Sequence, residues 1–144
     1  MAATAGICDT FKQEVLIGTH NFTVATDSFS MALMTSASTN TPSTLTNYSG
    51  IVGEVSTSGT AYAAKVLTNV TPVLNGNQGC VSFSSPITWT ASTFTARSAM
   101  IYNTTDGNKA VCILDFGGDK TSSAGDFTIT LPAQTGGNAI IRIT

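Results

Sequence analysis

Glycine-containing turn dipeptides divide the chain after residue 20 into short segments, and the clearest of these segments alternates apolar and polar residues. Over Thr93–Tyr102, every second residue from Phe94 onward falls on one face, and the residues between them fall on the other. This period of two predicts a β-strand. Asp106-Gly107 follows soon after it, and that dipeptide suits the positive φ angles of a short hairpin turn. We therefore expect a hairpin that joins this strand to the next one.

The other segments that lie between turn signals also resemble strands, and no helical pattern alternates with them. They cover Phe29–Thr35, Gly50–Ser56, Lys65–Thr71, Gly79–Phe83, Lys109–Phe116, Asp126–Leu131 and Ala139–Ile143, with further turns at Asn75-Gly76, Gly117-Gly118 and Gly136-Gly137. Short strands joined by turns favour a mainly β fold, an antiparallel β-sandwich of jelly-roll-like or immunoglobulin-like type. The length predicts a single domain over 1–144, divided into an N-terminal helical segment (1–20) and the β-sandwich (21–144).

The N-terminal segment has a different pattern. Ile7, Phe11, Val15 and Leu16 recur at intervals of three to four residues, and Gly18 follows them. This spacing predicts a short amphipathic helix. Because an isolated helix of this length is marginal in water, it has to pack on something. It is either a lid over the open end of the domain's own core or a docking element for a partner.

Residues 36–49 form the one long polar connection between predicted strands. They are rich in Ser, Thr and Asn and contain a proline. Polar segments of this length lie on the surface and often carry binding contacts. The segment is therefore either a surface loop of the sandwich or a contact arm.

Charge excludes several classes of function. Only 10% of the residues are Asp, Glu, Lys or Arg, and the formal net charge is −2. The six cations are scattered and form no basic patch, so we expect no binding to nucleic acid, whose affinity depends on neutralising phosphates. No apolar run approaches the roughly 20 residues needed to span a bilayer. Met1–Ile7 has no basic and apolar leader pattern, so we expect neither a signal peptide nor membrane attachment.

The cysteines and the histidine do not form a recognisable site. Cys8, Cys80 and Cys112 are widely spaced and odd in number, which argues against a disulfide framework, and a single histidine does not complete a zinc site. We expect three reduced, mostly buried thiols. His20 is the only histidine, and no Gly-x-Ser-x-Gly nucleophile motif is present, so His20 is expected to be structural or solvated.

Two fragments match parts of known motifs but lack the other residues that those motifs require. Asp115-Phe116-Gly117 spells the metal-binding tripeptide of kinases, and Gly117–Thr121 faintly resembles a phosphate loop, but the remaining elements of both motifs are missing. A strand end followed by a glycine turn explains both. Asp106, Asp115, Asp119 and Asp126 do not have the spacing of a calcium loop. We therefore expect no catalytic, cofactor-binding or metal-binding residues, no cofactor, and a protein that is not an enzyme.

Short motifs along nearly the whole chain resemble a family of small virion structural proteins of tailed bacteriophages. The motifs are signatures of turns and strands, and none of them is catalytic. They are Phe11–Leu16 with Gly18 and His20–Phe22, Leu67–Pro72, Thr95–Arg97 with Ile101–Asn103, Asn108–Val111, Leu114–Lys120, Gly125–Ile129 and Ala139–Ile143.

The resemblance implies a capsid decoration (cement) protein. Such a protein would bind the major capsid protein on the outside of the shell, stabilise the shell, associate with itself as a dimer or trimer, and be made in the host cytoplasm. The alternative is a tail, fibre or host-surface adhesion module of the virion. Both roles need a rigid scaffold with edges or loops that grip a partner, including by addition of a β-strand at a sheet edge.

Overall fold

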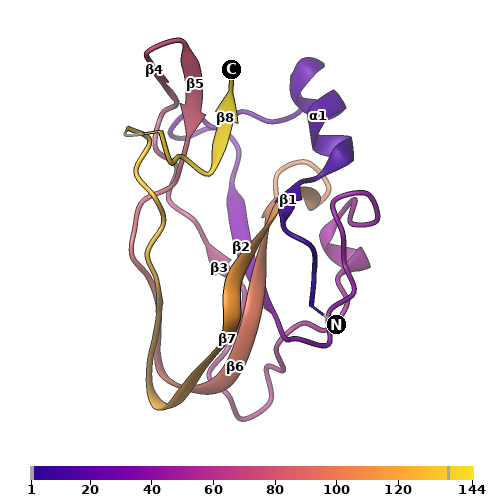
Figure 1. Ribbon diagram of the computed structural model, residues 1–144, viewed down its shortest axis with the longest axis vertical. Coiled ribbons are helices and arrows are strands. Elements are labelled where there is room, and N and C mark those ends of the chain that lie inside the picture. The colour runs from indigo at the N-terminus through magenta and orange to yellow at the C-terminus, as the bar shows by residue number, and fades with distance from the viewer. Residues whose placement is uncertain (1, 136) are drawn as a thin grey trace.

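The computed structural model describes residues 2–135 and 137–144 and is mainly β, with two antiparallel sheets (Figure 1). Gly136 of the predicted Gly136-Gly137 turn lies outside the described residues. In chain order the elements are β1 (Gly6–Ile7), α1 (Asp9–Leu16), β2 (Phe29–Met34), the 3-10 turn η1 (Tyr48–Gly50), β3 (Lys65–Val66), β4 (Val73–Asn75), β5 (Gln78–Val81), β6 (Ile87–Asn103), β7 (Lys109–Ile129) and β8 (Ile141–Ile143). No helix in this part of the chain is long and apolar enough to cross a membrane.

The larger sheet has the strand order β1-β7-β6-β2-β3, and the smaller one has the order β4-β5-β8. The smaller sheet lies at the same end of the molecule as α1 (Figure 1). β6 and β7 form the predicted hairpin, which is confirmed. Its connection is longer than a two-residue turn, and both Gly107 and Asn108 adopt positive φ angles in it, 65° and 57°.

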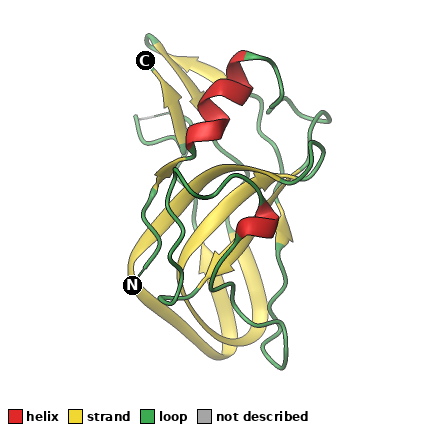
Figure 2. Ribbon diagram, turned by 90° about the vertical axis from the view of Figure 1, so that its right-hand side faces the viewer, coloured by secondary structure: helices red, strands yellow, loops and turns green. Residues whose placement is uncertain are grey.

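The β6–β7 hairpin bends strongly along its length (Figure 2). The pairing is interrupted at several points, most clearly between Ser98↔Asp115 and Ala96↔Lys120, where β7 contributes the extra residues. Extra residues in one strand bend it and increase its twist. The predicted strands Lys109–Phe116 and Asp126–Leu131 are therefore parts of one continuous strand, and the predicted strand end at Asp115-Phe116-Gly117 is wrong, because these residues begin a bulge inside β7.

Two predicted strands are mostly absent. Gly50–Ser56 contains only an isolated bridge between Glu54 and Met34, and Lys65–Thr71 contains only β3 and a bridge at Asn69. In the first of these segments the backbone bonds to a side chain, since the Val52 N–H donates to Asn40 Oδ1 at 2.7 Å. The other predicted strands agree with observed ones to within a few residues, except that β6 starts six residues before Thr93.

The predicted alternation in β6 holds only for its middle part. Ser92, Phe94, Ala96 and Ser98 are buried and the residues between them are not, whereas from Ser98 to Asn103 both faces are buried. Successive side chains of a strand point to opposite faces. Tyr48 stacks on Tyr102 with ring centroids 4.6 Å apart, while His20 contacts the next residue, Asn103. The sheet is therefore covered on both sides here, by the long polar segment and by the residues that follow α1.

The N-terminal segment is helical only over Asp9–Leu16, so the predicted helical extent of 1–20 is too long. β1 precedes the helix and pairs with β7 through Gly6↔Ile113 and Ile7↔Cys112. Phe11 faces the core and is buried, and α1 packs beside β7. The segment is thus a strand and a helix that are both attached to the larger sheet.

The polar segment 36–49 is fastened to the body of the molecule. Leu45 is fully buried, and the Asn40 side chain donates to the Gly50 carbonyl at 3.0 Å. Backbone bonds from Tyr48 N to Asn108 O and from Ala110 N to Thr46 O join the segment to the hairpin. The segment is therefore a packed surface loop, and its role as a contact arm stays a prediction.

Candidate functional site

His20 lies in a closed polar network. The His20 side chain is fully buried; its Nε2 lies 2.8 Å from Glu14 Oε2, and its Nδ1 lies 3.1 Å from Asn103 Nδ2. Asn103 Oδ1 accepts the backbone N–H groups of Thr105 and Asp106, so the amide presents its NH₂ group to the imidazole. Nδ1 therefore accepts and Nε2 donates to Glu14. Both nitrogens are used within the protein, which leaves neither free to take a proton from a substrate.

A second polar cluster surrounds Glu54. Its carboxylate accepts the hydroxyl groups of Tyr48, at 2.9 and 3.0 Å, and of Tyr62, at 2.8 Å. The Tyr62 oxygen also accepts the Leu33 N–H at 2.9 Å. Burial and the neighbouring Glu54 carboxylate raise the pKa of Tyr48 to about 12, and burial raises the pKa of Tyr62 as well. Both phenols therefore stay protonated at neutral pH and donate to Glu54, while the Tyr62 oxygen, as an acceptor, joins this cluster to Leu33 of β2.

We expect Tyr62→Phe to lower the free energy of unfolding by about 1–3 kcal/mol, because it removes one donor to Glu54 and the acceptor for the buried Leu33 N–H. Tyr48→Phe is the matched control, since the Tyr48 hydroxyl bonds to Glu54 alone among the described residues. It should cost less. Urea unfolding followed by circular dichroism measures both, and an equal or larger loss in Tyr48→Phe would contradict the double role of Tyr62.

The cysteines are free and buried, as predicted. Burial, together with the negative charges of Asp9 and Glu14, raises the pKa of Cys8 to about 12. Burial also raises the pKa of Cys112. Because the thiolate is the nucleophile and the metal ligand, the protonated thiols of Cys8 and Cys112 are poorly suited to either task.

The structure does not gather the four aspartates of the C-terminal third into a site. Asp115 pairs with Arg97 at 3.0 Å and accepts the Gly117 N–H, and these two contacts lower its pKa. Asp126 accepts the backbone N–H of Ala91. Over residues 2–135 and 137–144, no group of three or more His, Cys, Asp or Glu side chains is arranged to hold a metal ion.

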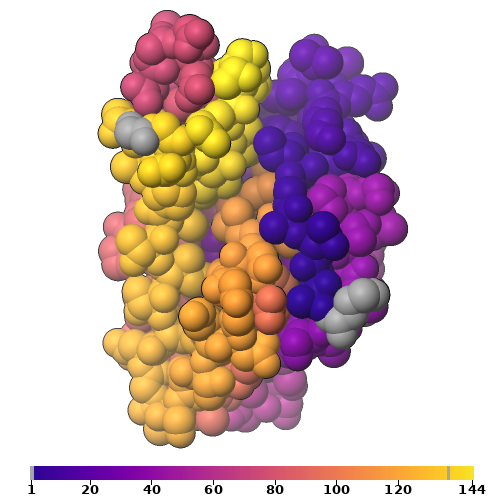
Figure 3. Space-filling view, in the orientation of Figure 1, coloured from indigo at the N-terminus to yellow at the C-terminus, as the bar shows by residue number. Residues whose placement is uncertain are grey.

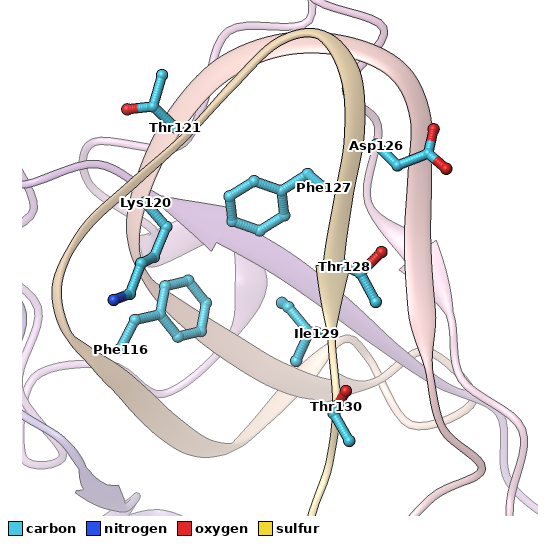
Figure 4. A pocket seen from close by; sticks show the side chains of 8 residues that line it. All are labelled: Phe116, Lys120, Thr121, Asp126, Phe127, Thr128, Ile129 and Thr130. Carbon is cyan, nitrogen blue, oxygen red and sulfur yellow. The ribbon is translucent and has the colours of Figure 1, made fainter.

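A surface hollow of about 440 Å³ lies inside the bend of β7 (Figure 4). We call it the β7 pocket. The rings of Phe116 and Phe127 point into it, with centroids 6.3 Å apart, and Ile129 lies beside them (Figure 4). All of its lining residues come from β7 or directly follow it: Phe116, Lys120, Thr121, Asp126, Phe127, Thr128, Ile129 and Thr130.

The outer edge of β7 is open along the β7 pocket. β1 covers this edge only at Cys112 and Ile113, and between Leu114 and Ile129 the described chain offers no second strand partner. An open edge presents backbone N–H and C=O groups that can pair with another strand. The pocket and the edge together can take an extended segment through backbone bonds and one apolar side chain.

The sequence did not point to the β7 pocket. Phe116 and Phe127 lie eleven positions apart, in two separate predicted strands, so no local pattern brings their rings together. The one local signal is Gly117-Gly118 between them, a pair that allows a bulge inside one strand as well as the predicted turn between two strands.

Comparison of the chain with protein-family models, with curated proteins and with solved structures finds no match. The resemblance to phage virion proteins therefore stays a prediction.

Proposed function

We propose that this chain is a non-enzymatic structural protein of a phage virion, a decoration protein that binds the major capsid protein on the outer surface of the shell. The observation that carries this proposal is the β7 pocket with its open strand edge, a surface suited to gripping another chain. The motifs that resemble virion proteins are the reason for proposing the major capsid protein as the partner.

The polar side chains of the described residues also support a structural role. His20 has both ring nitrogens bonded within the protein, and Glu54 bonds to two tyrosines, so these groups stabilise the fold. A low charge density limits repulsion between many copies crowded on one particle. Self-association as a dimer or trimer would raise the effective strength of modest individual contacts.

The finer architecture that we propose is a β-sandwich of jelly-roll-like or immunoglobulin-like type, with α1 as a lid at one end. The bend of β6 and β7 supports this architecture. It folds the far part of the hairpin, the part most distant from the turn between the two strands, over the hydrophobic core that the hairpin shares with β2. Trp89, Phe94 and Phe127 lie in that far part, within one hydrophobic cluster that also contains Met31 and Leu33 of β2.

The test is binding of the purified full chain to expanded capsids, followed by electron microscopy of tagged protein. We expect saturable labelling across the shell and improved survival of the capsids on heating. Labelling confined to the tail or fibres would assign the chain to the alternative adhesion role, and capsids of unchanged stability with no bound protein would refute the capsid proposal.

Phe116→Ser should weaken capsid binding by about tenfold or more, because apolar side chains in central pockets dominate binding energy. Val66→Ser is the control for loss of an apolar side chain, since Val66 is exposed on β3 and lies outside the β7 pocket. Because Phe116 is partly buried against the core, urea unfolding of both variants checks that the loss of binding is not a loss of folding. Binding curves from capsid co-sedimentation measure both variants. If Phe116→Ser binds as the wild type does, the β7 pocket is not the capsid-binding surface.

A further inference from the structure

α1 and β8 lie at the end of the molecule opposite the bend of β6 and β7 (Figure 1). A further hollow, of about 270 Å³, lies between them (Figure 3). We call it the α1–β8 groove. Phe11 and Ile141 are buried at this groove, whereas Leu16 and Ile143 are 85% and 59% exposed. Leu16 contributes little to the domain's own core, so its apolar surface is free to contact another molecule.

β8 is the terminal strand of its sheet. It pairs with β5 through Ile141↔Val81, Arg142↔Cys80 and Ile143↔Gly79, and its other edge has no strand partner among the described residues. The groove therefore combines apolar side chains with open backbone donors and acceptors. This combination fits an extended peptide segment that adds to the sheet as a fourth strand.

The charged side chains that line the groove are both cations, Lys12 and Arg142. Lys12 pairs with the exposed Asp9 at 2.8 Å. Arg142 donates to the Gly137 carbonyl and forms no ion pair within the described part of the chain. Glu14, on the same helix, is directed to His20 and does not neutralise the groove. The charge at the groove is thus complementary to a carboxylate.

The geometry of β8 defines a pattern for the occupant. Ile141 and Ile143 share one face of the strand, and Arg142 lies on the other. Directly opposed residues of paired strands lie on the same face and interact. A segment that pairs with β8 would therefore place apolar side chains beside the isoleucines and acidic side chains beside Arg142, at alternate positions.

A second copy of this chain fits the groove less well. The only register that pairs all three residues of two antiparallel β8 strands is centred on Arg142, and it places the two guanidinium groups directly opposite each other. Like charges at opposed positions of a sheet are destabilising.

We propose that the α1–β8 groove binds an extended segment of another protein in which apolar and acidic residues alternate. This site is separate from the β7 pocket and does not depend on which particle the protein decorates. A protein with docking surfaces at both ends can link two neighbouring subunits.

The experiment uses the full chain and three labelled peptides of equal length: alternating Val and Glu, alternating Val and Lys, and the Val/Glu composition in blocks. Fluorescence anisotropy gives the affinities. We expect the alternating Val/Glu peptide to bind about tenfold or more tightly than the other two, with weaker binding at high salt. Leu16→Ser and Arg142→Gln should each weaken it severalfold.

The controls match these variants in chemistry and differ in place. Val66→Ser removes an exposed aliphatic side chain on β3, and Lys65→Gln removes a cation on the same strand; both residues lie outside the two hollows, and both variants should bind the peptide as the wild type does. Equal binding of the three peptides, no binding, or wild-type affinity in Leu16→Ser and Arg142→Gln overturns the proposal. Light scattering adds one more outcome: an oligomer that Leu16→Ser converts to monomer would assign the groove to a second copy and overturn it too.

Discussion

Deletion of residues 1–20 is expected to abolish cooperative unfolding. The deletion removes β1, the buried side chains of Cys8 and Phe11, and His20 with its bonds to Glu14 and Asn103. Burial of one large apolar side chain contributes about 1.5–3 kcal/mol, and a buried polar group that loses its partner costs about 1–3 kcal/mol. The sum is comparable with the whole stability of a typical domain, about 5–15 kcal/mol.

The measurement is urea or thermal unfolding followed by near-ultraviolet circular dichroism and by the fluorescence of Trp89, the only tryptophan. The truncated chain should keep β-type far-ultraviolet signal but lose the near-ultraviolet signal of fixed packing. If it keeps a sharp two-state transition and fixed aromatic signals, α1 is dispensable for folding, and the segment is a docking element only.

Two point variants in α1 distinguish the stability that comes from core packing of the helix from any effect of a substitution on the helix itself. Phe11→Ala removes a buried ring and should cost about 3–5 kcal/mol. Leu16→Ala removes an exposed side chain and should leave the stability nearly unchanged. Equal losses in the two variants would contradict the burial of α1 through Phe11.

Trp89→Ala is expected to lower the free energy of unfolding by about 3–5 kcal/mol, the range observed when large aromatic residues are truncated in cores. Trp89 is 1% exposed. The centroid of its ring lies 6.0 to 6.3 Å from the ring centroids of Tyr62, Phe94 and Phe127. These contacts join the two strands of the bent hairpin to the loop before β3. The loss would therefore loosen the bend as well as leave a cavity.

Trp89→Phe is the control, because it keeps an aromatic ring and removes the indole N–H, which donates to the Ala63 carbonyl at 2.7 Å. We expect it to cost about 1–2 kcal/mol, the value of a buried hydrogen bond and part of the ring's contacts. Chemical denaturation followed by far-ultraviolet circular dichroism measures both variants. A Trp89→Ala loss no greater than that of Trp89→Phe would show that the bend does not depend on packing of this side chain.

Local pattern was sufficient for some elements and not for others. The alternation over Thr93–Tyr102 and the turn at Asp106-Gly107 correctly predicted the central hairpin, because both signals act within a few residues. The Gly117-Gly118 pair was ambiguous, since glycine allows a bulge as readily as a turn. A bulge forms instead of a turn when the partner strand is long enough to keep pairing beyond the glycines. β6 is long enough because it starts at Ile87, six residues before the predicted strand Thr93–Tyr102.

Composition and the alternation of apolar and polar residues are enough to predict a charge-poor, mainly β chain with three free thiols, because both are read from the chain without its tertiary contacts. Only the folded chain buries both Tyr102 and Asn103, encloses His20 between Glu14 and Asn103, and brings Phe116 and Phe127 to one hollow. Each of these juxtapositions joins positions far apart in the chain or on opposite faces of a strand. They arise because the bulged hairpin bends and because two distant segments cover the sheet from opposite sides, which no local pattern encodes.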